Sequence, residues 1–303
     1  MVRALCDAGM SATSASLRPY LATMAGIALF SAMDAVVKSA SIAVGAYSAY
    51  FLRCVIGFAM IAPVWWLRGG TWPERSVLKV HALRGVVVAF MGWAFFFSLV
   101  RLPLAEAIAI SFVAPLLALY LAAILLGEKI QPRAVAAALL GLAGVITIVG
   151  GKIGRDRMSE DAMIGLVAIL LSALLYAWNL VLQRQQALLA KPAEVSTFQN
   201  GVVAAVLLVA APFLLRLPEG RVWLEIGAGA ALAVGAALFL SWAYARAEAQ
   251  HLVPIEYTGF LWAALFGWLY FGERVTATTV AGAFLIVVGC WIATRKPPEI
   301  SAV

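Results

Sequence analysis

A shift of 145 residues lays the first half of this chain over its second half without a gap, from about residue 19 to residue 295. Residues 28–37 (ALFSAMDAVV) then stand over residues 173–182 (ALLYAWNLVL), and the loop pair Pro73-Glu74 stands over Pro218-Glu219. A shared apolar composition would not align loop residues in this way. A long-period duplication within an apolar chain is typical of membrane proteins built from two structural repeats, and of secondary transporters in particular.

The composition indicates that most of the chain lies in a lipid bilayer. Hydrophobic residues make up 64% of the 303 residues, charged residues 12%, and the mean hydropathy is +0.97, which is too apolar for a water-soluble globule. Because a spanning helix needs about 20 apolar residues, we predict ten spans and no soluble domain. They lie near residues 20–40, 46–67, 80–100, 103–126, 133–150, 163–186, 193–215, 222–245, 250–271 and 275–294.

Each repeat contains five of these spans, which is an odd number. The second repeat therefore enters the membrane from the opposite side, and the predicted fold is an all-α integral membrane protein with ten transmembrane helices as two inverted five-helix repeats. Inverted repeats can exchange conformations, which gives alternating access. The predicted division is a tail at 1–18, a first repeat at 19–151, a loop at 152–162, a second repeat at 163–295 and a tail at 296–303.

The distribution of basic residues predicts the orientation. With a cytoplasmic N-terminus, 13 Lys and Arg residues fall on the inner side and eight on the outer side, so the positive-inside rule places both tails in the cytoplasm. The first 17 residues lack the apolar core of a signal peptide, so we expect the first span to be retained. Because the net charge of +7 is spread over span ends, no nucleic-acid partner is expected.

Enzyme and metal chemistry find little support in the sequence. The three cysteines are scattered, the two histidines lack metal-ligand spacing, and no glycine-rich phosphate loop is present. We therefore predict a protein that is not an enzyme, with no cofactor and no metal site.

Polar side chains inside the spans are costly in lipid and usually face a cavity or a partner. Their depths, taken from a rise of about 1.5 Å per residue, define two layers around the midplane. We predict that these layers pass a small polar substrate between them. The outer layer contains Asp34, Lys38, Arg53 and Ser111, and the inner layer contains Asn179, Gln183, Gln199 and Glu256.

Each of these residues also has a purely structural interpretation. Asp34 and Lys38 are spaced for an ion pair within one helix, Arg53 could neutralise Asp34, and Lys38 could extend to the interface. Glu256 follows Pro254, which opens the helix locally, so a desolvated carboxylate there could carry a proton. Alternatively, Glu256 could pair with a cation such as Arg84 or Arg246.

Aromatic rings near the predicted cavity could line a small-molecule site, although rings also fill helix interfaces. Those selected as substrate contacts are Tyr50, Trp93, Tyr176, Trp178 and Tyr257. The acids Glu128 and Glu273 end their spans in Gly-Glu-Lys and Gly-Glu-Arg. We interpret both as turn-fixing residues that find partners in the turn and in the following base.

The ten spans and their motifs resemble the EamA domains of the drug/metabolite transporter superfamily. The resemblance rests on Leu-Gly-Glu-Lys at 126–129, Phe-Gly-Glu-Arg at 271–274 and Pro115 in the fourth span, and it extends over residues 19–295. The second repeat departs from the pattern, with Phe260 in the place of Pro115. The resemblance implies a bacterial inner-membrane carrier with a central cavity, often an exporter of amino acids or related metabolites.

Several functions remain open at this stage. The motifs at 33–38, 83–85 and 254–257 also resemble members that import S-adenosylmethionine or riboflavin. Proton-coupled efflux of cationic drugs and a scaffold or receptor without transport are further alternatives. A polar layer with both charge signs suits a zwitterion, so we predict an exporter of amino acids or similar metabolites that acts as a monomer.

Overall fold

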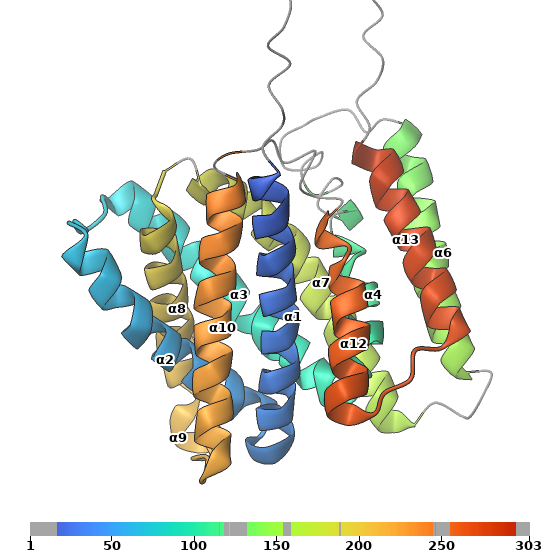
Figure 1. Cartoon of the computed structure of the whole chain (residues 1–303), viewed down its shortest axis with the longest axis horizontal. Helices are drawn as coiled ribbons and strands as arrows, with labels where there is room; N and C mark the ends of the chain where they lie inside the picture. The colour runs from blue at the N-terminus through green and yellow to red at the C-terminus, as the bar shows by residue number, and fades with distance from the viewer. Residues whose placement is uncertain are drawn as a thin grey trace, which may run out of the picture.

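The structure is a computed structural model that describes residues 17–114, 116–117, 121, 132–153, 159–187, 189–244, 246 and 255–294. Pro115, the motif at 127–129, Pro254 and most of the two tails lie outside these residues. The described part is all-α without a strand, as predicted (Figure 1). Its helices are α1 (Arg18–Val44), α2 (Ala46–Leu67), α3 (Arg75–Leu99), α4 (Leu104–Ser111), α6 (Pro132–Ile153), α7 (Glu160–Ala187), α8 (Pro192–Leu208), α9 (Ala211–Leu214), α10 (Arg221–Tyr244), α12 (Gly259–Phe271) and α13 (Ala277–Thr294).

Most predicted spans coincide with one helix. The helices α1, α2, α3, α6, α7, α10 and α13 begin and end within about five residues of the bounds predicted from hydropathy. The short helices α4 and α12 occupy parts of the predicted spans 103–126 and 250–271, and the rest of those spans lies partly outside the described residues.

The surface of the bundle is apolar, as a bilayer requires. Five helices are long and apolar enough to cross a membrane, namely α1, α2, α3, α7 and α10, and shorter apolar segments lie in α6, α12 and α13. Large side chains such as Leu67, Phe213 and Phe284 are exposed on the outside. A water-soluble monomer rarely exposes apolar surface on this scale, so the described fold is that of a multi-pass membrane protein.

The predicted span 193–215 is interrupted. Helix α8 ends at Leu208, residues 209–210 form a turn, and α9 starts at Ala211. Pro212 explains the break, because proline has no N–H to donate to the Leu208 carbonyl four residues earlier, and it is well suited to the first turn of a new helix. The hydroxyl of Tyr47 on α2 donates to the Leu207 carbonyl, which satisfies backbone at the interruption.

The most extensive helix contacts join the two halves of the chain. Helix α1 packs on α10, α2 on α8, α3 on α7, and α6 on α13. Figure 1 shows α1 beside α10 and α6 beside α13. The core of the protein is therefore formed between the repeats.

Helices α6 and α13 approach closely through glycines. A Cβ atom at Gly144 would lie 2.6 Å from the Gly282 carbonyl oxygen, and a Cβ at Gly282 would lie 2.5 Å from the Gly144 carbonyl oxygen. Such contacts are shorter than any side chain tolerates, so only glycine fits at both positions. Small residues at helix crossings allow the close backbone packing on which association in membranes depends.

Candidate functional site

The central charges are Asp34 on α1 and Arg53 on α2, both more than 90% buried. Their opposite charges act on each other. The Arg53 guanidinium donates to Cys54 Sγ at 3.2 Å and lies 5.3 Å from the centre of the Tyr50 ring. In the described part of the chain, Arg53 Nε has no acceptor, and no donor is recorded for the Asp34 carboxylate. Both groups therefore keep hydrogen-bonding capacity.

Tyr50 and Trp93 connect α2 to α3 beside this pair. The Tyr50 hydroxyl donates to the Val88 carbonyl at 3.0 Å, and its ring lies against Gly92, where a Cβ atom would approach it to 2.3 Å. Trp93 meets the ring of Tyr47 edge-on, with 6.1 Å between centroids. Tyr50 is thus fixed at the helix interface and presents its ring face to Arg53.

Lys38 lies one turn beyond Asp34 and is held by groups from two links between helices. Its ammonium pairs with the Glu273 carboxylate and donates to the Leu102 carbonyl at 2.9 Å. The Phe271 ring centre is 4.8 Å away. Lys38 itself is buried among these groups.

Glu273 owes its position to the Phe-Gly-Glu-Arg turn. Gly272 adopts a left-handed conformation (φ 64°), and its N–H donates to the Trp268 carbonyl at 3.0 Å, which closes α12 with an αL cap. The Glu273 N–H donates to the Gly267 carbonyl at 3.1 Å. The carboxylate turns back and accepts the N–H of Leu104, the first residue of α4, at 2.7 Å. Glu273 is a turn residue, as predicted, but its recorded partners are Lys38 and the N-terminus of α4.

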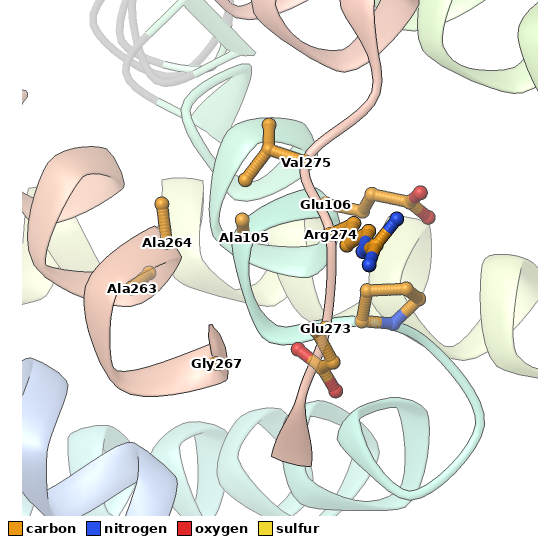
Figure 2. Close-up of a pocket in the computed structure, with 9 residues that line it drawn as sticks. Ala105, Glu106, Ala263, Ala264, Gly267, Glu273, Arg274 and Val275 are labelled. Atoms are coloured by element: carbon orange, nitrogen blue, oxygen red, sulfur yellow. The ribbon is translucent and has the colours of Figure 1, made fainter. Parts of the chain in front are cut away.

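A small pocket with about 200 Å³ of empty volume lies beside this turn. Figure 2 shows that its lining comes from the start of α4, from α12 and from the link between α12 and α13. Glu106, Glu273 and Arg274 are its charged residues.

A second polar cluster joins α3 to α7. Arg84 Nε donates to Asn179 Oδ1 at 2.9 Å, one terminal nitrogen donates to Gln186 Oε1, and the other to Gln183 Oε1 at 3.4 Å. Gln186 also bonds His81 Nδ1, and His81 Nε2 lies 3.2 Å from Glu194 on α8. Two residues of the predicted inner layer, Asn179 and Gln183, are thus brought together around an arginine.

Tyr176 lies between the two groups of charges. Its hydroxyl is within electrostatic range of Asp34, Arg84 and Glu256. Tyr176 and Asn179 are three residues apart on α7 and share one helix face. Tyr176 is thus acted on by charges from both groups of residues.

The remaining predicted residues lie more to the side. The Tyr257 ring meets Phe112 edge-on at 5.2 Å, and Ser111 Oγ donates to the Ala107 carbonyl within its own helix. Gln199 on α8 is half-buried, and Trp178 on α7 is 39% exposed on the outside. Among the selected residues, Asp34, Arg53 and Tyr50 form one group, Asn179 belongs to the Arg84 cluster, and the charges of Asp34 and Glu256 act on Tyr176.

The sequence analysis did not select Arg84, His81, Gln186 or Glu194 as site residues. A signal was present for α7, where Asn179, Gln183 and Gln186 follow an i, i+4, i+7 spacing that places three amides on one helix face. Arg84 was named only as a possible partner of Glu256, because a single arginine near a span end gives no sign of its true partners. Among the described residues, no group of three His, Cys, Asp or Glu side chains could hold a metal ion.

Comparison with known proteins gives a consistent result. The model of the EamA-like transporter family matches residues 17–150 and again residues 163–295. The pseudopaline exporter CntI of Pseudomonas aeruginosa is 30% identical over 273 residues, which cover 88% of this chain and 92% of that protein. A riboflavin transporter of Brucella anthropi is 25% identical over 78% of this chain and 84% of its own length.

A shorter match and a solved structure complete the comparison. The aromatic amino acid exporter YddG of Ancylobacter novellus is 33% identical over 116 residues, or 38% of each chain. One crystal structure has a TM-score of 0.62 and 25% identity, and the match covers 91% of this chain and 96% of that chain. Two matches to one family model, spanning nearly the whole chain, establish that this protein belongs to the EamA-like transporter family and is a membrane transporter, not an enzyme.

Proposed function

We propose that this protein is a secondary transporter of the inner membrane that exports amino acids or related small metabolites by alternating access. The observation that carries the proposal is the group of Asp34, Arg53 and Tyr176 inside the bundle. Buried groups of both charge signs that keep hydrogen-bonding capacity suit a zwitterionic solute. A helix scaffold without transport would carry the cost of burying these groups and gain nothing from them.

We further propose that the ten spans form two inverted repeats. Two observations support this arrangement. Under the 145-residue shift, the pair α1 and α10 corresponds to the pair α7 and α3, while α2–α8 and α6–α13 each correspond to themselves. In Figure 1, α1 begins and α13 ends at the same end of the bundle, as an even number of spans requires. In the orientation given by the positive-inside rule, this end faces the cytoplasm.

A second candidate is uptake of a cofactor-like metabolite. It is favoured by the riboflavin transporters among the relatives, one of them 27% identical over 92% of this chain. The two candidates differ in substrate shape and charge. A flat, uncharged ring system needs stacking surfaces, whereas an amino acid needs partners for two opposite charges.

Uptake into proteoliposomes tests the proposal. Purified protein is reconstituted and offered radiolabelled amino acids, S-adenosylmethionine and riboflavin, with and without a pH gradient. Saturable accumulation of amino acids that unlabelled amino acids abolish is the expected result. Accumulation of riboflavin or S-adenosylmethionine alone would replace the proposal with cofactor uptake. If uptake depends on the pH gradient, Glu256 is the first carboxylate to substitute.

Asp34→Asn is expected to lower uptake of the transported amino acid by at least about tenfold, since a charge-assisted hydrogen bond is lost at a desolvated site. The amide occurs naturally at the matching position of the second repeat, Asn179, so the change preserves size and helix packing. Asp161→Asn is the matched control, because Asp161 is exposed and pairs with Arg101 at 2.9 Å. Equal uptake by both variants would show that Asp34 is not part of the substrate site.

A further inference from the structure

Arg84 is a buried cation held entirely by neutral groups. Only 6% of the residue is exposed, and its three recorded acceptors are the side-chain amides of Asn179, Gln183 and Gln186. No ion pair between Arg84 and a carboxylate is found among the residues that the structure describes. The nearby Glu194 pairs with His81 instead.

The lack of a carboxylate partner distinguishes Arg84 from three cations of the bundle that do have an acidic partner. Lys38 has Glu273, Arg101 has Asp161, and the charge of Arg53 acts on Asp34. A buried charge is expensive unless it is paired, so a protein that retains an unpaired one leaves a position that an anion can fill. The three amides orient the guanidinium without cancelling its charge.

The guanidinium also has donors to spare. Arginine carries five N–H groups, and the three recorded bonds leave one hydrogen on each terminal nitrogen without a recorded acceptor among the described residues. The two terminal nitrogens of a guanidinium can bind both oxygens of one carboxylate. The bond to Gln183 is long at 3.4 Å, and Gln183 is exposed, so a solute oxygen can replace it at little cost.

Arg84 is linked to the proposed substrate site through Tyr176. The charge of Arg84 and the Tyr176 hydroxyl act on each other, and Tyr176 is also within range of Asp34. Tyr176 is therefore acted on by a cation from α3 and by an acid from α1.

From this geometry we propose that Arg84 is the receptor for a carboxylate group of the transported substrate. The inference rests on the proposed transport function and narrows it to substrates that carry a carboxylate. Asn179, Gln183 and Gln186 act as positioning residues that aim the guanidinium. In the alternative interpretation, Arg84 only connects α3 to α7 through its hydrogen bonds and does not contact the substrate.

Three compounds with the same ring separate these arrangements. L-phenylalanine carries both charges, 3-phenylpropionate carries only the carboxylate, and phenethylamine carries only the ammonium. Binding is measured as the ligand-dependent rise in melting temperature of the purified protein in detergent, and transport as uptake of radiolabelled L-phenylalanine with the other two as competitors. The thermal readout does not depend on transport.

For the unsubstituted protein, we expect L-phenylalanine to bind at least about tenfold more tightly than phenethylamine, which corresponds to one charge-assisted contact. In Arg84→Gln this ratio is expected to fall towards one, while Arg84→Lys retains part of it because the charge remains without the paired N–H geometry. Arg101→Gln, which removes an arginine already paired with Asp161, should leave the ratio unchanged.

A folded Arg84→Gln protein that binds all compounds more weakly but keeps the ratio would show a structural tie and overturn the inference. Equal binding of L-phenylalanine and phenethylamine by the unsubstituted protein would overturn the inference while leaving transport intact. Carboxylate-selective binding without uptake of any compound would support the receptor and refute the transport function. Uptake of riboflavin alone, with no binding of the three compounds, would overturn both.

Discussion

Gly144→Val is expected to separate α6 from α13 and to abolish most of the folded protein. The Cβ of the new side chain would lie 2.5 Å from Ile286 Cγ1 and 2.6 Å from the Gly282 carbonyl oxygen. The Ile286 side chain could rotate away. The Gly282 carbonyl belongs to the backbone of the opposing helix and cannot move without that helix. We expect the free energy of unfolding to fall by roughly 3 kcal/mol or more, which is the upper end of the usual cost of overpacking.

The measurement is the yield of monodisperse protein in mild detergent and its thermal transition. Gly150→Val is the matched control, because Gly150 lies on the same helix and a Cβ there would meet nothing within 4 Å. The control should melt within a few degrees of the unsubstituted protein. Similar behaviour of the two variants would show that α6 and α13 are not packed as described.

Lys38→Met is expected to be the most damaging of the charge substitutions. It leaves the Glu273 carboxylate, whose side chain is 18% exposed, without its cation and takes the donor from the Leu102 carbonyl. Removing one partner of a buried pair typically costs about 3–5 kcal/mol. We therefore expect a clear fall in melting temperature at neutral pH.

The double variant Lys38→Met with Glu273→Gln isolates the interaction. The stability lost by the double variant should be smaller than the sum of the stabilities lost by the two single variants. The reason is that the glutamine carries no charge and can still accept the Leu104 N–H. Arg101→Gln with Asp161→Asn is the exposed comparison, since Asp161 is 70% exposed and such pairs contribute about 1 kcal/mol or less. Additive losses at Lys38 and Glu273 would mean that the two charges do not interact.

The sequence predicted the positions of most helices because hydropathy depends on the bilayer, which acts on every span alike. The interruption at residues 209–210 was not predicted, although Pro212 provides the local cause. The hydropathy window averages over 20 residues, so a two-residue turn inside an apolar segment leaves it unchanged. The pairing of α1 with α10, or of α6 with α13, has no local signal at all.

The candidate site was predictable in its residue types but less so in its partners. Buried charges such as Asp34 and Arg53 stand out in an apolar chain. Depth along a helix was estimated well enough to group Asn179 with Gln183, but rotation about the helix axis was not. Trp178, next in sequence to Asn179, was also selected as a substrate contact, and the two side chains differ in burial: Trp178 is 39% exposed and Asn179 is buried. The partner of Glu273 is a lysine 235 residues away, which no short motif encodes.

The Lys38–Glu273 pair has a consequence for synthesis of the chain. The two residues are separated by 235 positions, so at 5–20 residues per second the lysine is made roughly 10 to 50 s before its carboxylate exists. During this interval the first helix must hold an ammonium group within the translocation machinery or the new bilayer without its final partner. The pairing that fixes the first helix in place is therefore timed by the emergence of the ninth predicted span and the turn that follows it from the ribosome.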